Sequence, residues 1–470
     1  MTYIPTIGLE VHAELNTKSK MFCGCKNEPH GSEPNAHICP VCMAHPGTLP
    51  VPNEQAIEMV LMFGQAVEAT VATFSEFDRK NYFYPDIPKA YQISQYAFPF
   101  LTGGKLQGVE LTRVHLEEDT ARSQHDKGEN SLVDYNRAGV PLMELVTEPV
   151  IHDAETAGRF ARELQLLLRT LKISEANMER GEMRVEANIS VSKVEGELGT
   201  KVEVKNLNSF KSVESAIAYE ISRQIELLEN GDKINQETRG WEENKLKTFV
   251  QRSKETAKDY RYFPDPDIPK IFTPEHTAFR QSVLTEKMPI LPSKKRELYQ
   301  NLGLTSDTIE VIMADISLDN FFAEVVAQEG LSAEFVKLSA NYLTSDITAL
   351  LSNEEYSLDN LQLAHFVELI KMLEANEIGS RVAKDLLNGM FGSEESPKAT
   401  ATRLNLLQVS DDASLQTVVD ELIAENQDAV TQYKEGKESS IQFLVGQGMK
   451  KTKGAANPAR LKELIESSIK

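Results

Sequence analysis

Alternating apolar and polar residues mark several stretches of the first 290 residues as half-buried β-strands. The pattern is clear in TIGLEVHAEL (6–15), MRVEANISVS (183–192) and TKVEVKNLNS (200–209). Helical spacing appears in ETAGRFARELQLLLRTLK (155–172) and in SVESAIAYEISRQIELLENG (212–231). Gly231 is suited to end the second of these helices. The mixture predicts an α/β unit over residues 1–290.

From about residue 291 the strand-like alternation stops and helical periodicity takes over. LQLAHFVELIKML (361–373) carries an apolar stripe at helical spacing, and a break follows at 389–397. Beyond about 406 another amphipathic helix is expected, and a chain of 470 residues has room for about three domains. We therefore predict an α+β protein with a mixed domain at 1–290, a helical domain at 291–405 and a small helical tail at 406–470.

Two distant segments resemble each other, RKNYFYPDIPK (79–89) and DYRYFPDPDIPK (259–270). Both are rich in proline and extended, so turn chemistry alone explains the similarity. We do not treat them as an internal repeat.

The termini and the charge narrow the classes of function. The first residues lack the basic and apolar regions of a signal peptide, and no apolar run approaches the ~20 residues that span a bilayer. A cytoplasmic protein without membrane contact is expected. The net charge of −21 excludes non-specific coating of nucleic acid. One local exception is the region 447–470, which contains six basic and two acidic residues. Composition alone favours a solvated helix face there.

All four cysteines of the chain lie in one loop, residues 21–47. They form a Cys-x-Cys pair and a Cys-x2-Cys pair thirteen residues apart: Cys23, Cys25, Cys39 and Cys42. Disulfides rarely persist in the cytosol, so the spacing favours a closed, structural zinc site with four thiolates. The alternative is a turn-rich loop with reduced, unligated thiols.

Some of the predicted strands carry acidic residues and histidine where mixed polar residues would be ordinary. Glu10 and His12 share one side of the first strand, and further acidic residues follow in RVHLEED (113–119) and VDYNRAGVPLMELVTEP (133–149). Oxygen ligands with one imidazole suit Mg²⁺ or Mn²⁺. Spacing alone does not bring these segments together, and solvated strand faces remain the simpler interpretation at this point.

Familiar catalytic motifs are missing from the sequence. It contains no Walker A pattern, no G-x-G-x-x-G that opens a helix and no G-x-S-x-G elbow. A nucleotide-using enzyme would need another kind of site.

A series of motifs in one order nevertheless resembles a known family. They are IGLEVHAELNTKSKMF, FDRKNYFYPDIPKAYQISQY, HLEEDTARS, DYNRAGVPLMELVTEP, MRVEANIS, VKNLNSF, QETRGW, DYRYFPDPDIP and FLVGQGMKKTKGAANP. Together they are similar to the B subunits of tRNA-dependent amidotransferases over nearly the whole chain. The resemblance implies a cradle-like catalytic domain at 1–290, a helical domain and a YqeY-like tail that touches tRNA. The sequence has no room for the inserted domain of the archaeal glutamyl-only relatives.

The resemblance also implies a reaction and its participants. ATP and Mg²⁺ would serve to phosphorylate the side-chain carboxylate of misacylated Glu-tRNA(Gln) or Asp-tRNA(Asn), and ammonia would then displace phosphate. An amidase subunit would supply the ammonia from glutamine, and a small third subunit would clamp the two. Phosphorylation makes chemical sense because a free carboxylate is a poor acyl donor.

The family's functional residues can be carried over position by position. The Mg²⁺ ligands would be His12, Glu118 and Glu144, with Glu10 beside them in the reaction chamber. Further chamber residues would be Arg184, Glu186, Asn188 and Lys205. The expected tRNA contacts in the tail are Lys450, Lys451 and Lys453. The residues that contact ATP stay unassigned, and the cysteines are expected to be structural, because some members of the family lack them.

Two other classes of protein remain as alternatives. A non-catalytic zinc-ribbon scaffold that binds RNA would explain the cysteines and the basic tail, but not the carboxylates on the strands. A stand-alone carboxylate–amine ligase would need no amidase partner.

Overall fold

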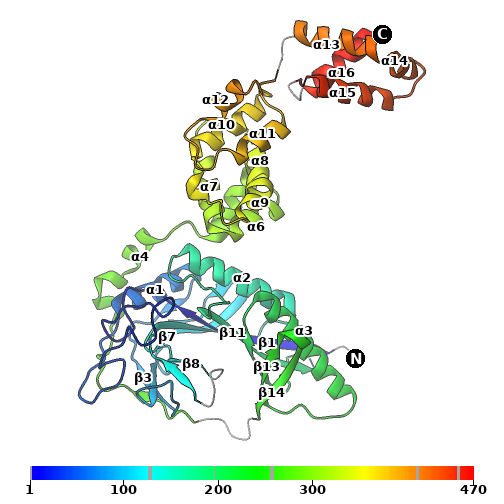
Figure 1. Ribbon diagram of the computed structural model, residues 1–470. Helices are drawn as coiled ribbons and strands as arrows, with labels where there is room; N and C mark the ends of the chain where they lie inside the picture. Colours follow the sequence, from blue (N-terminus) through cyan, green and yellow to red (C-terminus); the bar gives the residue numbers. More distant parts are fainter. Residues whose placement is uncertain are drawn as a thin grey trace. The chain divides into compact units, whose positions relative to one another are not determined.

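The computed structural model describes residues 3–124, 130–194, 196–253, 259–408, 412–452 and 456–469. The chain divides into two compact units, Met1–Pro292 and Ser293–Lys470. Among the described residues every strand lies in the first unit, and the second is built from helices (Figure 1). This confirms the predicted α+β class. The further division of the helical part near residue 405 stays a prediction.

One large sheet forms the framework of the first unit. Its strand order is β14-β13-β12-β11-β1-β10-β7-β5-β2, and β6 pairs with β7. The strands are β1 (Ile4–Glu14), β2 (Thr70–Val71), β5 (Leu101–Thr102), β6 (Lys105–Leu106), β7 (Val109–Glu118), β10 (Pro141–Thr147), β11 (Met183–Ser192), β12 (Val202–Leu207), β13 (Glu237–Glu242) and β14 (Lys247–Ser253). Adjacent strands run antiparallel except β12 and β13, which are parallel. The three alternating stretches of the sequence are thus β1, β11 and β12.

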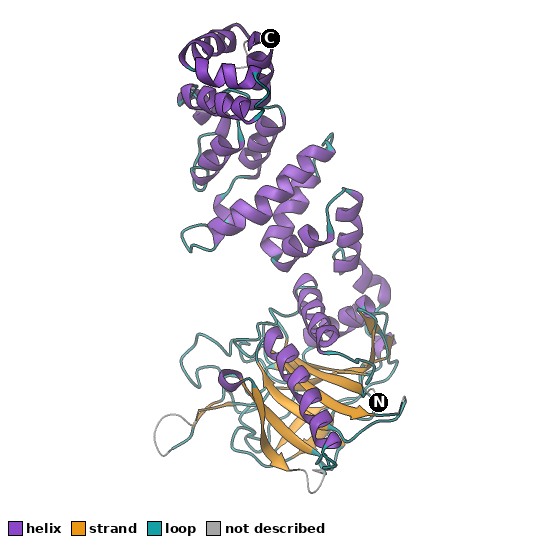
Figure 2. Cartoon of the chain, turned by 90° about the vertical axis from the view of Figure 1, so that its right-hand side faces the viewer, coloured by secondary structure: helices purple, strands orange, loops and turns teal. Residues whose placement is uncertain are grey.

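Helices cover one face of this sheet, as Figures 1 and 2 show. They are α1 (Glu54–Ala66), α2 (Ala154–Thr170) and α3 (Phe210–Glu229), and their apolar residues share a core with every second residue of β1 and β11. The helix starts are capped by side chains, since Asp153 accepts from Thr156 N and Ser209 accepts from Ser212 N. Gly231 follows α3 with φ 82°, close to the expected end. Because the helices bury the apolar face, the polar residues of the central strands are left on the opposite face.

Two small sheets lie off the main one. The strands β3 (Asp78–Asn81), β4 (Tyr91–Ser94) and β15 (Phe263–Pro264) pair in the order β15-β3-β4, and β8 (Arg122–Gln124) pairs with β9 (Leu132–Asp134). The short helices of this unit are η1 (Glu243–Lys245), η2 (Thr273–Glu275), η3 (Thr277–Phe279) and α4 (Gln281–Lys287). The two segments that resemble each other in sequence therefore meet, because β15 belongs to one and β3 to the other.

The described residues of the second unit form helices joined by loops. Its elements are α5 (Pro292–Asn301), α6 (Ser306–Ala314), α7 (Ile316–Val326), α8 (Ala333–Tyr342), η4 (Leu343–Ile347), α9 (Thr348–Leu351), η5 (Leu358–Asn360), α10 (Leu363–Glu374), α11 (Ser380–Asn388), α12 (Pro397–Arg403), α13 (Asp412–Glu425), α14 (Gln427–Lys434), α15 (Ser439–Lys451) and α16 (Pro458–Ile469). The last four share a core of their own, which includes Leu415, Leu444 and Leu461. In the part of the chain that the structure describes, no helix has both the length and the apolar character to cross a membrane.

Candidate functional site

Strand register aligns a row of charged side chains across the open face of the large sheet. His12 on β1 lies opposite Glu144 on β10 and opposite Arg184 on β11. Glu144 in turn lies opposite His115 on β7. Residues directly opposite each other in antiparallel strands share a face and approach within a few ångströms. The pairing therefore gathers groups that are far apart in the sequence.

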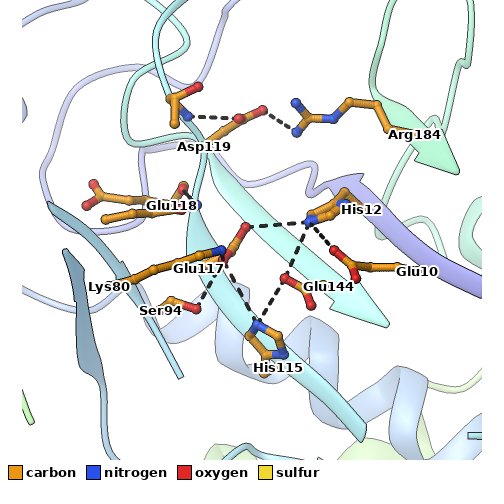
Figure 3. A network of polar contacts seen from close by, with 12 residues as sticks. Glu10, His12, Lys80, Ser94, His115, Glu117, Glu118, Asp119, Glu144 and Arg184 are labelled. Carbon is orange, nitrogen blue, oxygen red and sulfur yellow. Dashed lines mark hydrogen bonds and ion pairs between the residues drawn. The ribbon is translucent and has the colours of Figure 1, made fainter. Parts of the chain in front are cut away.

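The two histidines of this row converge on Glu144, as Figure 3 shows. The Nε2 atoms of His12 and His115 each lie 3.3 Å from Glu144 Oε2. His12 Nε2 is also 3.8 Å from Glu117 Oε1 and 3.9 Å from Glu10 Oε1. Two overlapping sets, Glu10–His12–Glu144 and His115–Glu117–Glu144, have ligand atoms within 4.8 Å of one another and could each hold a metal ion. Carboxylates with an imidazole fit a hard divalent cation such as Mg²⁺ or Mn²⁺.

The pKa values of His12, Glu10 and Glu144 are shifted by burial and by the charges of their neighbours. Burial favours the neutral ring of His12, but the hydrogen bond to Glu144 and the charges of Glu144 and Glu117 raise its pKa to about 9. For Glu10, burial and the nearby Glu144 raise the pKa above the usual range. Burial opposes ionisation of Glu144, yet His115 and His12 hold the pKa of this carboxyl well below its usual range. A divalent cation would take over the compensation that a proton on His12 supplies without one.

Glu117 occupies the position that the family resemblance assigned to Glu118. Neighbouring residues on a strand point to opposite faces, and Figure 3 shows Glu117 turned toward His12 and Glu118 turned away. Glu118 Oε2 lies 2.7 Å from Lys89 Nζ, and its Oε1 accepts from Ile93 N at 3.0 Å. The structure thus brings Glu117, and not Glu118, to the cluster around His12 and Glu144, and which of the two binds a metal stays a prediction.

The remaining chamber residues surround the same cavity. Arg184, Glu186, Asn188 and Lys205 line it together with Glu10 and His12, and its volume is about 510 Å³. Lys205 Nζ lies 2.5 Å from Glu186 Oε2. Arg184 donates to the buried Asp119 at 2.7 Å. Burial raises the pKa of Asp119, but Arg184 and Arg137 outweigh it and lower that pKa, so Asp119 anchors Arg184 as an ion pair.

Sequence reasoning missed a group of tyrosines and one lysine in this cavity. Lys80 lies 3.9 Å from Glu117 Oε2, and the tyrosines that line the cavity are Tyr82, Tyr96, Tyr260 and Tyr262. They come largely from the two similar segments, which run side by side where Asn81 N donates to Tyr260 O at 2.9 Å. The similarity of these two segments was the signal in the sequence that could have identified the tyrosine-lined side of the cavity.

The four cysteines come together in the loop between β1 and α1. Their Sγ atoms lie within 4.8 Å of one another, so they could hold a metal ion, and none of the four is in a disulfide. Cys39 N donates to Cys42 Sγ at 3.1 Å. The hydrogen bond from the Cys23 thiol, together with the backbone hydrogen bond from Cys39 and the charge of Lys20, outweighs burial and lowers the pKa of Cys42 to about 4. Tetrahedral tetrathiolate coordination by zinc fits this donor set.

A buried lysine faces the thiols. Lys20 is 1 % exposed, its Nζ lies 3.9 Å from Cys42 Sγ, and it donates to Tyr135 O at 3.1 Å. A buried ammonium needs negative charge nearby, and thiolates supply it. No pattern in the sequence indicates this partner.

The cysteine loop packs behind the strand that carries Glu117 and Glu118. Met21 N donates to Gly139 O at 2.7 Å, and a Cβ on Gly139 would lie 3.7 Å from Cys42 Cβ and 3.8 Å from Glu118 Oε2. Gly139 has φ 86°, a conformation that favours glycine. The loop therefore supports the sheet from the side away from the cavity, which is consistent with a structural role.

The lysines expected to contact tRNA differ in their surroundings. Lys451 Nζ lies 2.8 Å from both Glu421 and Glu425, so its charge is shared with two carboxylates. Lys450 is exposed near the end of α15. Lys453 lies outside the described residues.

Within the described residues, fold and site define an α+β chain with two metal-capable side-chain clusters and a helical second unit. Residues 5–278 match the family model described as the GatB/GatE catalytic domain, and residues 320–469 match the GatB domain. Among the relatives of the chain are B subunits of aspartyl/glutamyl-tRNA(Asn/Gln) amidotransferases. That of Thermoanaerobacter sp. (strain X514) is 41% identical over 482 residues and covers 100% of both chains. That of Thermomicrobium roseum is 43% identical over 484 residues, covering 100% of this chain and 99% of its own.

This chain belongs to the family of aspartyl/glutamyl-tRNA(Asn/Gln) amidotransferase B subunits. The resemblance inferred from the sequence motifs is thereby confirmed.

Proposed function

We propose that this chain is the component of a tRNA-dependent amidotransferase that activates and amidates the amino acid on misacylated Glu-tRNA(Gln), Asp-tRNA(Asn) or both. The observation that carries the proposal is the convergence of His12, Glu117 and Glu144 on one face of the sheet, in a chain of this family. Such a cluster suits phosphate chemistry, in which a cation compensates the charge of the reacting groups.

The proposed reaction has two steps. An oxygen of the substrate's side-chain carboxylate bonds to the γ-phosphorus of ATP, and ADP leaves with the bridging oxygen. The nitrogen of ammonia then bonds to the activated carbonyl carbon, the carbon–oxygen bond breaks and phosphate leaves. His12, Glu117 and Glu144 would hold Mg²⁺, which supplies positive charge against the developing negative charge of the phosphoryl group.

The other cavity residues have roles that follow from their charges. Glu10, whose pKa burial and Glu144 raise, is suited to accept a proton as ammonia loses one. Arg184 is held by Asp119 and Lys205 by Glu186, so both cations keep a fixed place on the cavity wall. They would attract the phosphates of the nucleotide and of the activated substrate.

Two partner subunits and a second metal complete the proposal. The sequence has no G-x-S-x-G elbow, so an amidase subunit would release ammonia from glutamine, and a small third subunit would clamp the two. The four cysteines would bind one structural zinc.

The test is to assemble the chain with its amidase and clamp subunits and to supply both misacylated tRNAs, ATP and glutamine. We expect ATP cleavage that depends on misacylated tRNA, and amide formation on at least one of the two tRNAs. A scaffold would bind RNA without tRNA-dependent ATP cleavage. A stand-alone ligase would amidate with glutamine when the amidase subunit is left out. Either result would contradict the proposal.

The tail is proposed to position the tRNA by contacts with its phosphates. Deleting residues 411–470 is expected to weaken tRNA binding while ATP cleavage at saturating tRNA is retained, because the carboxylate cluster lies in the other unit. Replacing the exposed Lys450 by alanine should lower the slope of log affinity against log salt by roughly one unit, as expected for one lost phosphate contact. The measurement is tRNA binding over a range of salt concentrations.

Lys462→Ala is the matched control, since Lys462 lies 3.7 Å from Glu466 on the next turn of α16. We expect its salt slope to stay at the wild-type value. An unchanged affinity and slope in the truncated protein would show that tRNA recognition lies elsewhere.

A further inference from the structure

One wall of the cavity is aromatic. Tyr96 and Tyr262 stack with ring centroids 4.5 Å apart and planes inclined by 12°. Tyr260 packs edge-on against Tyr262 at 6.1 Å and against Tyr82 at 5.8 Å. All four rings line the cavity that holds Glu10, His12 and Glu144. The mechanism proposed above uses none of them.

The backbone fixes the two segments that carry these rings. Asn81 N donates to Tyr260 O at 2.9 Å, and the Asn81 side chain donates to Arg261 O at 2.8 Å. Arg261 has φ 46°, and the Asp259 side chain accepts from its N at 3.0 Å. On the other segment, the buried Asp78 accepts from Tyr96 N at 2.8 Å. Because hydrogen bonds fix the backbone beside Tyr262 and at Tyr96, the stacked pair is held before any ligand arrives.

The pair offers a flat aromatic face to a ligand. Tyr96 is 61 % exposed although one face of its ring is covered by Tyr262. Its uncovered face is therefore accessible. Aromatic side chains with a free face are the usual platforms on which nucleobases stack.

Cations lie on the same cavity, as a nucleotide requires. Lys80 Nζ sits 5.3 Å from the centre of the Tyr260 ring. The other cationic residues of the lining are Arg113, Arg184, Lys201 and Lys205. A base on the aromatic wall would thus leave its phosphates among positive side chains and near the carboxylate–histidine cluster. The volume of about 510 Å³ is in the range of small-ligand sites.

We propose that the stacked pair Tyr96–Tyr262 is the platform for an adenine base in this cavity. The inference rests on the proposed function in one respect, since that function supplies two adenines. One belongs to ATP, and the other is the 3′-terminal adenosine of the tRNA, which carries the amino acid. Both present the same purine face.

The test uses the assembled complex with its partner subunits and two fluorescent probes. One is 2-aminopurine riboside triphosphate, and the other is a tRNA with 2-aminopurine in place of its terminal adenine. We expect quenching of at least one probe when it stacks. Tyr96→Ala should weaken binding of that probe by about 5- to 150-fold, the range for loss of one base–aromatic stack.

Three further variants separate stacking from other effects. Tyr96→Phe keeps the ring and should bind within about twofold of wild type, whereas Tyr96→Leu keeps bulk without an aromatic face and should behave like Tyr96→Ala. Tyr84→Ala is the matched control, because Tyr84 is also 61 % exposed but is not among the residues that line the cavity. Its probe affinities should be unchanged.

The outcomes are distinct. A loss confined to the triphosphate probe assigns the platform to ATP, and a loss confined to the tRNA probe assigns it to the acceptor end. Unchanged affinity of both probes in Tyr96→Ala, absence of quenching in wild type, or an equal loss in Tyr96→Phe would overturn the platform. If the probes stack but no amide forms on either tRNA, the proposed function fails and the platform stands. If amides form and Tyr96→Ala binds both probes normally, the platform alone fails.

Discussion

Replacing Glu144 by glutamine is expected to reduce tRNA-dependent ATP cleavage by about 10³-fold or more. Glu144 accepts from both His12 and His115 and belongs to both metal-capable sets of the cavity. Glutamine keeps the shape of the side chain but removes the charge that a hard cation needs. A catalytic metal contributes several kcal/mol to transition-state stabilisation, and about 1.4 kcal/mol corresponds to a tenfold change in rate. The measurement is phosphate release by the assembled complex during a titration with MgCl2.

Variants of Glu117 and Glu118 test which of these two neighbouring residues belongs to the metal site. Glu117→Gln should raise the Mg²⁺ concentration needed for half-maximal rate, because Glu117 lies in the cluster with His12. Glu118→Gln breaks the contact with Lys89 but should leave the Mg²⁺ requirement at its wild-type value. Glutamine hydrolysis by the amidase subunit should remain at least at its basal level in all three variants. If only Glu118→Gln changes the Mg²⁺ requirement, the placement of Glu117 at the metal is wrong.

The alternation of apolar residues in the sequence could have predicted that Glu117, and not Glu118, faces the cavity. In β7 the apolar residues Val114 and Leu116 alternate with polar ones, and this phase puts Glu117, not Glu118, on the polar face. Earlier in the strand the apolar residues are Val109 and Leu111, in the opposite phase. The change of phase coincides with a register shift opposite Val146 and Thr147, where β7 has an extra residue. Such a bulge reverses which side chains face the core, so alternation must be followed from the nearer apolar residues.

Other parts of the site depended on contacts that no local pattern encodes. Alternation predicted β1, β11 and β12, because each strand buries one face. It did not predict that His12 lies opposite Glu144. These residues are far apart in the sequence, and the register between their strands is set by packing of the whole sheet. Lys20 was missed for a similar reason. A lysine is ordinarily exposed, and only the folded loop shows that this one is buried against Cys42.

The second large effect is expected at the cysteine loop. Cys39→Ser removes one of four thiolates, and we expect zinc content to fall from about one equivalent to well below it. Zinc contributes about 10 kcal/mol or more to the folding of isolated zinc-finger peptides. Even a fraction of this should lower the unfolding temperature of the first unit by about 5 °C or more, since 1 kcal/mol corresponds to roughly 2–4 °C at this size. Elemental analysis and thermal unfolding measure the two effects.

The effect should be local, because the loop packs behind β7 and not in the cavity. Limited proteolysis should cut the variant, or wild type treated with a chelator, between residues 26 and 38, while the Mg²⁺ requirement of the molecules that stay folded is unchanged.

A graded variant tests whether Lys20 stabilises the thiolates. Lys20→Met removes the ammonium beside Cys42 but keeps an unbranched side chain of similar length in the buried position. Without that positive charge, a tetrathiolate site holding Zn²⁺ carries excess negative charge in a buried place. Zinc affinity is therefore expected to fall by about 10- to 100-fold, the range found for residues that support metal ligands.

Lys26→Met is the control, since Lys26 lies between the cysteine pairs but is exposed, and the zinc affinity of this variant should stay at the wild-type value. Competition with a chromogenic chelator gives both affinities. Full zinc affinity in Lys20→Met would show that Lys20 serves only to hold Tyr135 O, and wild-type protein without zinc would remove the structural metal site altogether.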